Sequence, residues 1–216
     1  DDKYPEITDV VKNYLNAFLI EDDAKRAEII AQYVGNLYDI NSVKQRTYVS
    51  EYSDVECYTK KGPYDDTYVV YAYYQMGLKN IDTTVPAITR LYVVRDKKTG
   101  NVYIQNDSGD DIQKYMNKVT KDSDVQDLLK DVQEEFESVK ASDPKVKAYY
   151  DAINAKANEK KNETTTGTSN NKNETTASHT SNNATTKASV TTQAPTTKVN
   201  SATKPQTTAS KNNKNK

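Results

Sequence analysis

The segment between Lys44 and Gln105 alternates apolar and polar residues with a period of two, and this pattern constrains the fold more than any other feature. It predicts β-strands at residues 44–59, 67–78, 87–95 and 101–105, and the polar residues around Asp54 predict a bulge or break in the first strand. The turn sequences KKGPYDD and DKKTGN join the first and last pairs, whereas KNIDTTVP makes a longer, less regular connection. Short connections between successive strands imply an antiparallel meander.

Segments with helical periodicity precede and follow this meander. Pro5 suits the first position of a helix, and the residues after it place apolar side chains at the i, i+3, i+4 and i+7 spacing of one helix face. Further helices are predicted to begin near Asp22, Ser108, Asp122 and Asp143. The order of helices, strands and helices predicts an α+β fold.

Composition divides the chain into two parts. All 17 tyrosines lie at or before Tyr150, and no aromatic residue, leucine or isoleucine occurs from Asn162 onward. Thr, Ser and Asn account for 32 of the last 55 residues, and such a segment cannot bury enough apolar surface to offset the entropy of ordering it. We therefore predict a globular domain at residues 1–161 and a disordered linker or stalk at residues 162–216.

Charge and residue types exclude several kinds of function. The net charge of the chain is −1, and the last 55 residues carry +5, so residues 1–161 carry −6. A negatively charged domain argues against a nucleic-acid partner. The only histidine, His179, lies in the predicted linker, so histidine-dependent nucleophilic catalysis and most zinc sites are absent from the predicted domain. Cys57 is the only cysteine, so no intrachain disulfide can form.

The segment NDSGDD briefly resembles a calcium-binding loop, but it lacks glycine at the sixth position and has Asn117 where a bidentate glutamate belongs. A helix cap explains it better. We predict no catalytic residue, no metal and no cofactor, and we treat carboxylates near strands and loops as solvated surface charges by default. Carboxylate chemistry stays open at four such positions: Asp54, Glu56, Asp82 and Asp96.

The alternation also assigns the tyrosines to faces of the sheet. Aliphatic residues such as Val70 and Ala72 are expected to fill the space between helices and sheet, leaving ring hydroxyls outside it. The opposite face forms a candidate recognition or dimer face made of Tyr71, Tyr73, Arg90, Tyr92 and Tyr103. Two interpretations of this face compete. In the first, the face is covered, either by the helices after Asp122 or by a second subunit. In the second, it is an exposed binding platform, since Tyr and Arg are enriched at binding hot spots.

Several stretches carry a resemblance to a known family: YTKKGP, YVVYAYY, KNIDT followed by proline, RLYVV and the hairpin DKKTGNVYI. Over roughly Tyr4 to Lys156 the chain resembles the NTF2-like (cystatin-like) superfamily, and within it a group of uncharacterised surface proteins of Gram-positive bacteria. The resemblance implies N-terminal helices packed on a curved antiparallel β-meander and an extracytoplasmic site, secreted or membrane-anchored at the cell surface. The superfamily includes ketosteroid isomerases and scytalone dehydratases, which act inside the cone between helices and sheet. No segment here matches their motifs.

These observations favour a non-catalytic extracytoplasmic binding or assembly module, tethered by a low-complexity linker to the cell surface or another domain. The expected partner is an unidentified protein, a cell-wall component or a second copy through the sheet face. The alternative is a cone enzyme of isomerase or dehydratase type acting on a small apolar molecule, and a pure spacer is a third option. The chain starts at Asp1 and has no apolar run of about 18 residues, which suits a secreted segment or one cut after an anchor.

Overall fold

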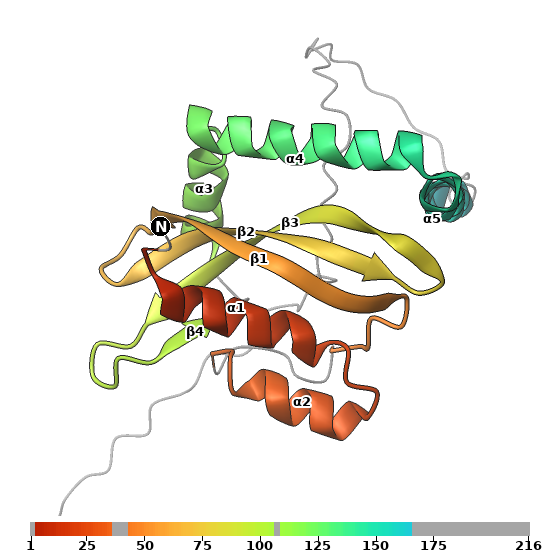
Figure 1. The fold of residues 1–216 in the computed structure, drawn as a ribbon. Helices are drawn as coiled ribbons and strands as arrows, with labels where there is room; N and C mark the ends of the chain where they lie inside the picture. Colours follow the sequence, from red (N-terminus) through yellow and green to blue (C-terminus); the bar gives the residue numbers. More distant parts are fainter. Residues whose placement is uncertain (1–2, 36–42, 106–108, 166–216) are drawn as a thin grey trace, which may run out of the picture.

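The computed structural model describes residues 3–35, 43–105 and 109–165, with side chains as far as residue 155. The described residues form five helices and four strands in an α+β arrangement (Figure 1). In chain order these are α1 (Pro5–Ala17), α2 (Asp23–Ala31), β1 (Val49–Lys61), β2 (Thr67–Leu78), β3 (Ile81–Arg95), β4 (Val102–Ile104), α3 (Asp110–Val119), α4 (Ser123–Ser142) and α5 (Pro144–Thr165).

The predicted helix starts agree with the structure where it describes them. α1 begins at Pro5, and the Asp22 carboxylate caps α2 by accepting a hydrogen bond from the Lys25 backbone N–H at 2.7 Å. α4 and α5 begin directly after Asp122 and Asp143. Ser108, the predicted cap of α3, lies outside the described residues, as does the predicted linker beyond residue 165.

The sheet is an open antiparallel meander in the order β1-β2-β3-β4, which confirms the predicted topology. The predicted bulge in β1 is confirmed by a register shift between Ser53 and Glu56, where Asp54 has a φ of 50°. β1 itself starts at Val49, so the predicted start at Lys44 is wrong.

The predicted long connection between β2 and β3 is also wrong, because β3 starts at Ile81 and pairs with Leu78 across a tight turn. Asn80 adopts a φ of 66° in this turn, a conformation that asparagine tolerates better than most residues. Pro86, the last residue of the predicted connection, lies inside β3. The strand accommodates it because β4 pairs only with residues 93–95, so no ladder bond is lost on that side at Pro86.

Helices cover both faces of the sheet. α1 and α2 lie against one face and α3 and α4 lie across the other, with α5 beside the end of α4 (Figure 1). We call the face toward α1 the inner face and the face toward α4 the outer face. Alternation along β2 places Val70 and Tyr74 in the inner core and Val69 and Tyr71 in the outer core, as the sequence pattern predicts. No described helix combines the length and hydrophobicity needed to cross a bilayer.

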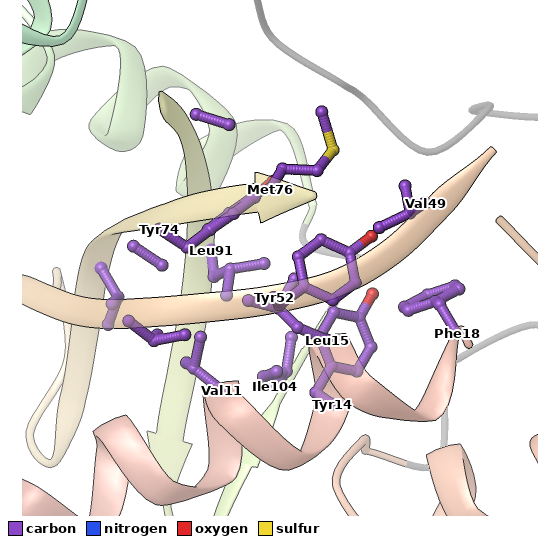
Figure 2. Close-up of a cluster of buried hydrophobic side chains, with 14 of the residues drawn as sticks. Val11, Tyr14, Leu15, Phe18, Val49, Tyr52, Tyr74, Met76, Leu91 and Ile104 are labelled. Atoms are coloured by element: carbon purple, nitrogen blue, oxygen red, sulfur yellow. The ribbon is translucent and has the colours of Figure 1, made fainter. Parts of the chain in front are cut away.

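The inner core is both aliphatic and aromatic. One face of α1 contributes Val11, Tyr14, Leu15 and Phe18, which pack against side chains of the sheet (Figure 2). Tyr52 and Tyr74 meet edge to face with ring centroids 5.3 Å apart. The expectation that aliphatic residues alone fill this space is therefore wrong.

The buried hydroxyls of Tyr52 and Tyr74 need polar partners, and the fold supplies one for each. The Tyr74 hydroxyl lies 3.0 Å from Thr89 Oγ1, and the Tyr52 hydroxyl accepts a hydrogen bond from Arg46 at 2.8 Å. A partnered hydroxyl can be buried without the cost of an unsatisfied group, so tyrosine is tolerated inside.

Candidate interaction surface

The five residues of the predicted recognition or dimer face come from β2, β3 and β4, and the structure covers part of that face with helices. Tyr71 and Tyr92 are only 2% and 3% exposed and pack in a cluster with side chains of α3 and α4. Tyr73, Arg90 and Tyr103 are partly buried. A partner cannot contact the rings of Tyr71 and Tyr92 while α3 and α4 are in place. Binding through the partly exposed members stays a prediction.

Thr120, directly after α3, joins two of these residues to the helical layer. The Arg90 guanidinium donates to Thr120 Oγ1 at 2.8 Å and to Asn117 Oδ1 at 3.0 Å. The Thr120 hydroxyl donates to the Met116 carbonyl at 2.8 Å, so the Tyr71 hydroxyl, also 2.8 Å away, is the donor to Thr120. Burial raises the pKa of Tyr71 above its ordinary value. This network fixes the corner between α3 and α4 on the sheet.

Tyr73 belongs to a separate contact with α4. Its hydroxyl donates to the Glu135 carboxylate at 3.1 Å, and Gln75 Nε2 donates to the same carboxylate at 2.9 Å. Burial, followed by the bond to Glu135, raises the pKa of Tyr73. The predicted face is thus divided between two helix contacts rather than assembled into one pocket.

Tyr103 lies apart from both contacts. Its ring lies against Gly35, where a β-carbon would come within 2.9 Å of it. Tyr103, Gly35, Glu6 and Val10 help line an open hollow of about 670 Å³ beside β4.

The four carboxylates at which chemistry was left open all lie at the surface or in turns. Asp54, Glu56 and Asp82 are exposed, and Asp96 accepts backbone N–H bonds from Lys98 and Thr99 that hold a turn and lower its pKa. Among the side chains that the structure describes, no Asp or Glu is buried, and no three His, Cys, Asp or Glu gather as a metal site would require.

A partly buried arginine, Arg46, lies beside the inner core near the end of α1. Its guanidinium lies 4.4 Å from the centroid of the Phe18 ring and bonds to Tyr52. Burial raises the pKa of Tyr52 from 10.0 to about 12, against the opposing effect of Arg46. Tyr52 therefore stays protonated near neutral pH and is a weaker acid than an ordinary tyrosine.

The accessible aromatic surface lies elsewhere, on and beside β1. Tyr58 is 45% exposed on β1, and Tyr64 is 56% exposed in the turn that follows. Tyr58 faces the same side as Tyr71, as the sequence pattern suggested, whereas Tyr48 lies beside Tyr149 of α5. Sequence reasoning did not single out β1 as a surface. The signal was present, because the first strand of a meander is an edge strand.

Comparison with known proteins identifies no relative: no family model matches the chain, and neither curated proteins nor solved structures include a similar protein.

Proposed function

We propose that this chain is a non-catalytic extracytoplasmic binding or assembly module, held at the cell surface or joined to another domain by its low-complexity segment. The proposal includes membership of the NTF2-like superfamily and the group of Gram-positive surface proteins. Two N-terminal helices packed on one face of an antiparallel meander support the fold assignment. The Thr-, Ser- and Asn-rich composition after Asn162 supports the tether.

The observation that carries the proposal is the filling of the inner core. Enzymes of the superfamily act inside the space between helices and sheet, and here that space holds packed side chains that include Leu15, Tyr52, Tyr74 and Leu91. An isomerase or dehydratase needs an acid or base whose pKa lies near the working pH. The Tyr52 pKa of about 12 does not meet that need, and no described carboxylate is buried there.

The exposed aromatic residues support binding at the surface instead. Tyr58 and Tyr64 present ring area and a hydroxyl with little conformational freedom to lose, which is the property that enriches tyrosine at binding hot spots. They lie close together in the chain, on β1 and in the turn after it.

The binding function can be tested by cosedimentation of the full chain with cell envelopes isolated from the producing bacterium. We expect the wild type to sediment with the envelopes and a Tyr58→Ser, Tyr64→Ser variant to lose about tenfold in apparent affinity, the usual effect of removing a hot spot. Tyr48→Ser is the matched control, since Tyr48 is 38% exposed but lies beside α5. Absence of wild-type binding would contradict the envelope-binding version.

The same preparation tests the enzyme alternative. We expect a panel of steroids and small aromatic ketones to leave the unfolding midpoint of the protein unchanged. A ligand raises this midpoint only if it binds the folded state, and the filled inner core leaves no space for it. A raised midpoint, together with altered fluorescence of the buried tyrosines, would favour the cone-enzyme alternative over our proposal.

A further inference from the structure

β1 is the edge of the sheet that no other described strand pairs with. The opposite edge, β4, is occupied by the chain after α2. The Ile104 N–H donates to the Tyr33 carbonyl and the Gly35 N–H donates to the Ile104 carbonyl, both at 2.9 Å. Among the described residues no second strand pairs with β1, so this edge of the sheet is open to another strand.

The hydrogen-bond pattern shows which groups of β1 point outward. The Gly62 N–H donates to the Thr67 carbonyl at 2.7 Å, which makes this a hydrogen-bonded pair of the β1–β2 ladder. In an antiparallel ladder such pairs alternate, so the N–H and C=O groups of Thr59 and Lys61 point away from β2. The Lys61 carbonyl already accepts a bond from the Tyr115 hydroxyl at 3.2 Å and has a second lone pair for another donor. The regular part of this edge, after the bulge at Asp54, is residues 56–61, which include Tyr58.

The side chains of this stretch are complementary to a reversed copy of themselves. Glu56, Tyr58 and Lys60 share the outer face, where they pair with alternate residues of β2. If a second β1 runs antiparallel with Tyr58 opposite Tyr58, each Glu56 faces Lys60 of the other copy. The same alignment places Tyr58 at a non-hydrogen-bonded position between the copies, where facing side chains approach most closely.

We propose that the open edge of β1 pairs with β1 of a second copy about a two-fold axis at Tyr58, joining two four-stranded sheets into one. This inference rests on the assembly version of the proposed function and names its partner. A two-fold interface uses the same patch on both copies, so a strand that is its own complement is what such an interface requires. Natural edges are commonly protected by charges that would repel a second strand, whereas here the lysine of one copy meets a glutamate of the other.

The surface beside Tyr58 also has room for the partner's ring. A depression of about 140 Å³ lies between Tyr58, Tyr71 and the start of α4, with Val125 and Leu128 as apolar walls. Lys60 lies at its rim, with Nζ 2.6 Å from Asp124 Oδ2 and 3.5 Å from Asp122 Oδ2. Its ammonium group has three donors, so it can bond to a partner's Glu56 while it keeps Asp124.

Charge reversal tests the pairing and its register. Sedimentation velocity of the full chain is expected to show a concentration-dependent dimer between micromolar and sub-millimolar concentrations. Glu56→Lys and Lys60→Glu should each weaken the dimer by about tenfold or more, since each creates two like-charged pairs. An equimolar mixture of the two variants restores both opposite-charge pairs and should form a heterodimer of wild-type affinity. Lys147→Glu is the matched control, because it reverses an exposed charge on α5, outside the predicted interface.

Cross-linking gives a second readout that does not depend on those charges. At the predicted position the two Cα atoms of residue 58 lie about 4.5 Å apart, within reach of a disulfide. Tyr58→Cys with Cys57→Ser should therefore form a covalent dimer under mild oxidation, whereas Tyr64→Cys with Cys57→Ser, in the exposed turn, should not.

A wild-type monomer over the whole range would overturn the edge dimer, as would a dimer that both charge reversals leave intact. Failure of the mixture to recover, or equal cross-linking at residues 58 and 64, would overturn the register. Each of these results leaves envelope binding to be decided by its own assay, so the dimer can fail while the proposed function stands.

Discussion

Tyrosine is used here in two physical environments, one buried and one exposed. Tyr52 and Tyr74 are buried because Arg46 and Thr89 bond to their hydroxyls, so the rings contribute apolar packing without leaving a polar group unsatisfied. Tyr58 and Tyr64 keep large exposed areas, and their hydroxyls donate to the surface carboxylates of Glu56 and Asp111. The same residue type therefore builds both the core and the surface.

The buried Tyr52 makes stability depend on alkaline pH. Its pKa is raised from 10.0 to about 12 in the folded chain, so the folded state keeps a proton that the unfolded state loses between these values. The stabilisation is complete below pH 10 and is lost as the pH rises toward 12, with a slope of about 1.4 kcal/mol per pH unit for this group. Urea unfolding from pH 9 to 12 should show this fall for the wild type. Tyr52→Phe should flatten it, and an unchanged slope in the variant would assign the effect to other groups.

At the level of elements, the sheet is covered on both faces by helices that differ in how they attach. α1 attaches through a nearly continuous apolar face, whereas α3 and α4 combine apolar contacts such as Met116 and Val125 with polar contacts at their junction. α4 reaches both layers, because Val125 lies in the outer core and Phe136 packs in the inner one. The Thr120 junction is therefore the point where the sheet sets the direction of α4.

Removal of the Thr120 hydroxyl should loosen this junction. Thr120→Val keeps the shape of the side chain but removes the acceptor of the Tyr71 hydroxyl and one of the two acceptors of Arg90, so we expect a loss of about 1–3 kcal/mol in unfolding free energy. Hydrogen exchange should become faster in α3 and at the start of α4 while α1 is unaffected. Ser142→Ala, which removes a bond from an exposed hydroxyl to Val139, is the control. Equal protection of α3 in the variant and the wild type would show that apolar packing alone holds the helix.

On the scale of the whole molecule, the residues that make the two cores all precede Asp151. The inner core includes Val146 of α5, so α5 is part of the packed domain at its start. The Asp143 carboxylate supports that start by accepting bonds from Thr83 and from the Lys145 N–H, which lower its pKa. The chain beyond α5 has no aliphatic or aromatic set from which to build a further core.

A chain that ends at Thr165 should therefore unfold at the same urea midpoint and with the same slope as the full chain, since the slope follows the surface that unfolding exposes. Denaturation followed by tyrosine fluorescence measures both. A shorter chain that ends at Asp143 is the control and should be less stable, because it loses Val146 from the inner core. A lower midpoint for the chain ending at Thr165 would mean that the low-complexity segment packs on the domain.

The sequence alone was enough to predict the α+β order, the antiparallel meander, the bulge near Asp54 and the two faces of β2. Each of these features depends on periodicity or turn chemistry over a few neighbouring residues. Tertiary structure alone decided which face each helix covers, and hence that Tyr71 and Tyr92 are buried while Tyr58 is exposed. It also allowed Pro86 inside a strand, because β4 pairs with β3 only beyond that residue, and Tyr52 inside a core, because Arg46 bonds to its hydroxyl. Contacts between residues far apart in the chain carry no local periodicity, so the covering of the sheet became visible only in the folded molecule.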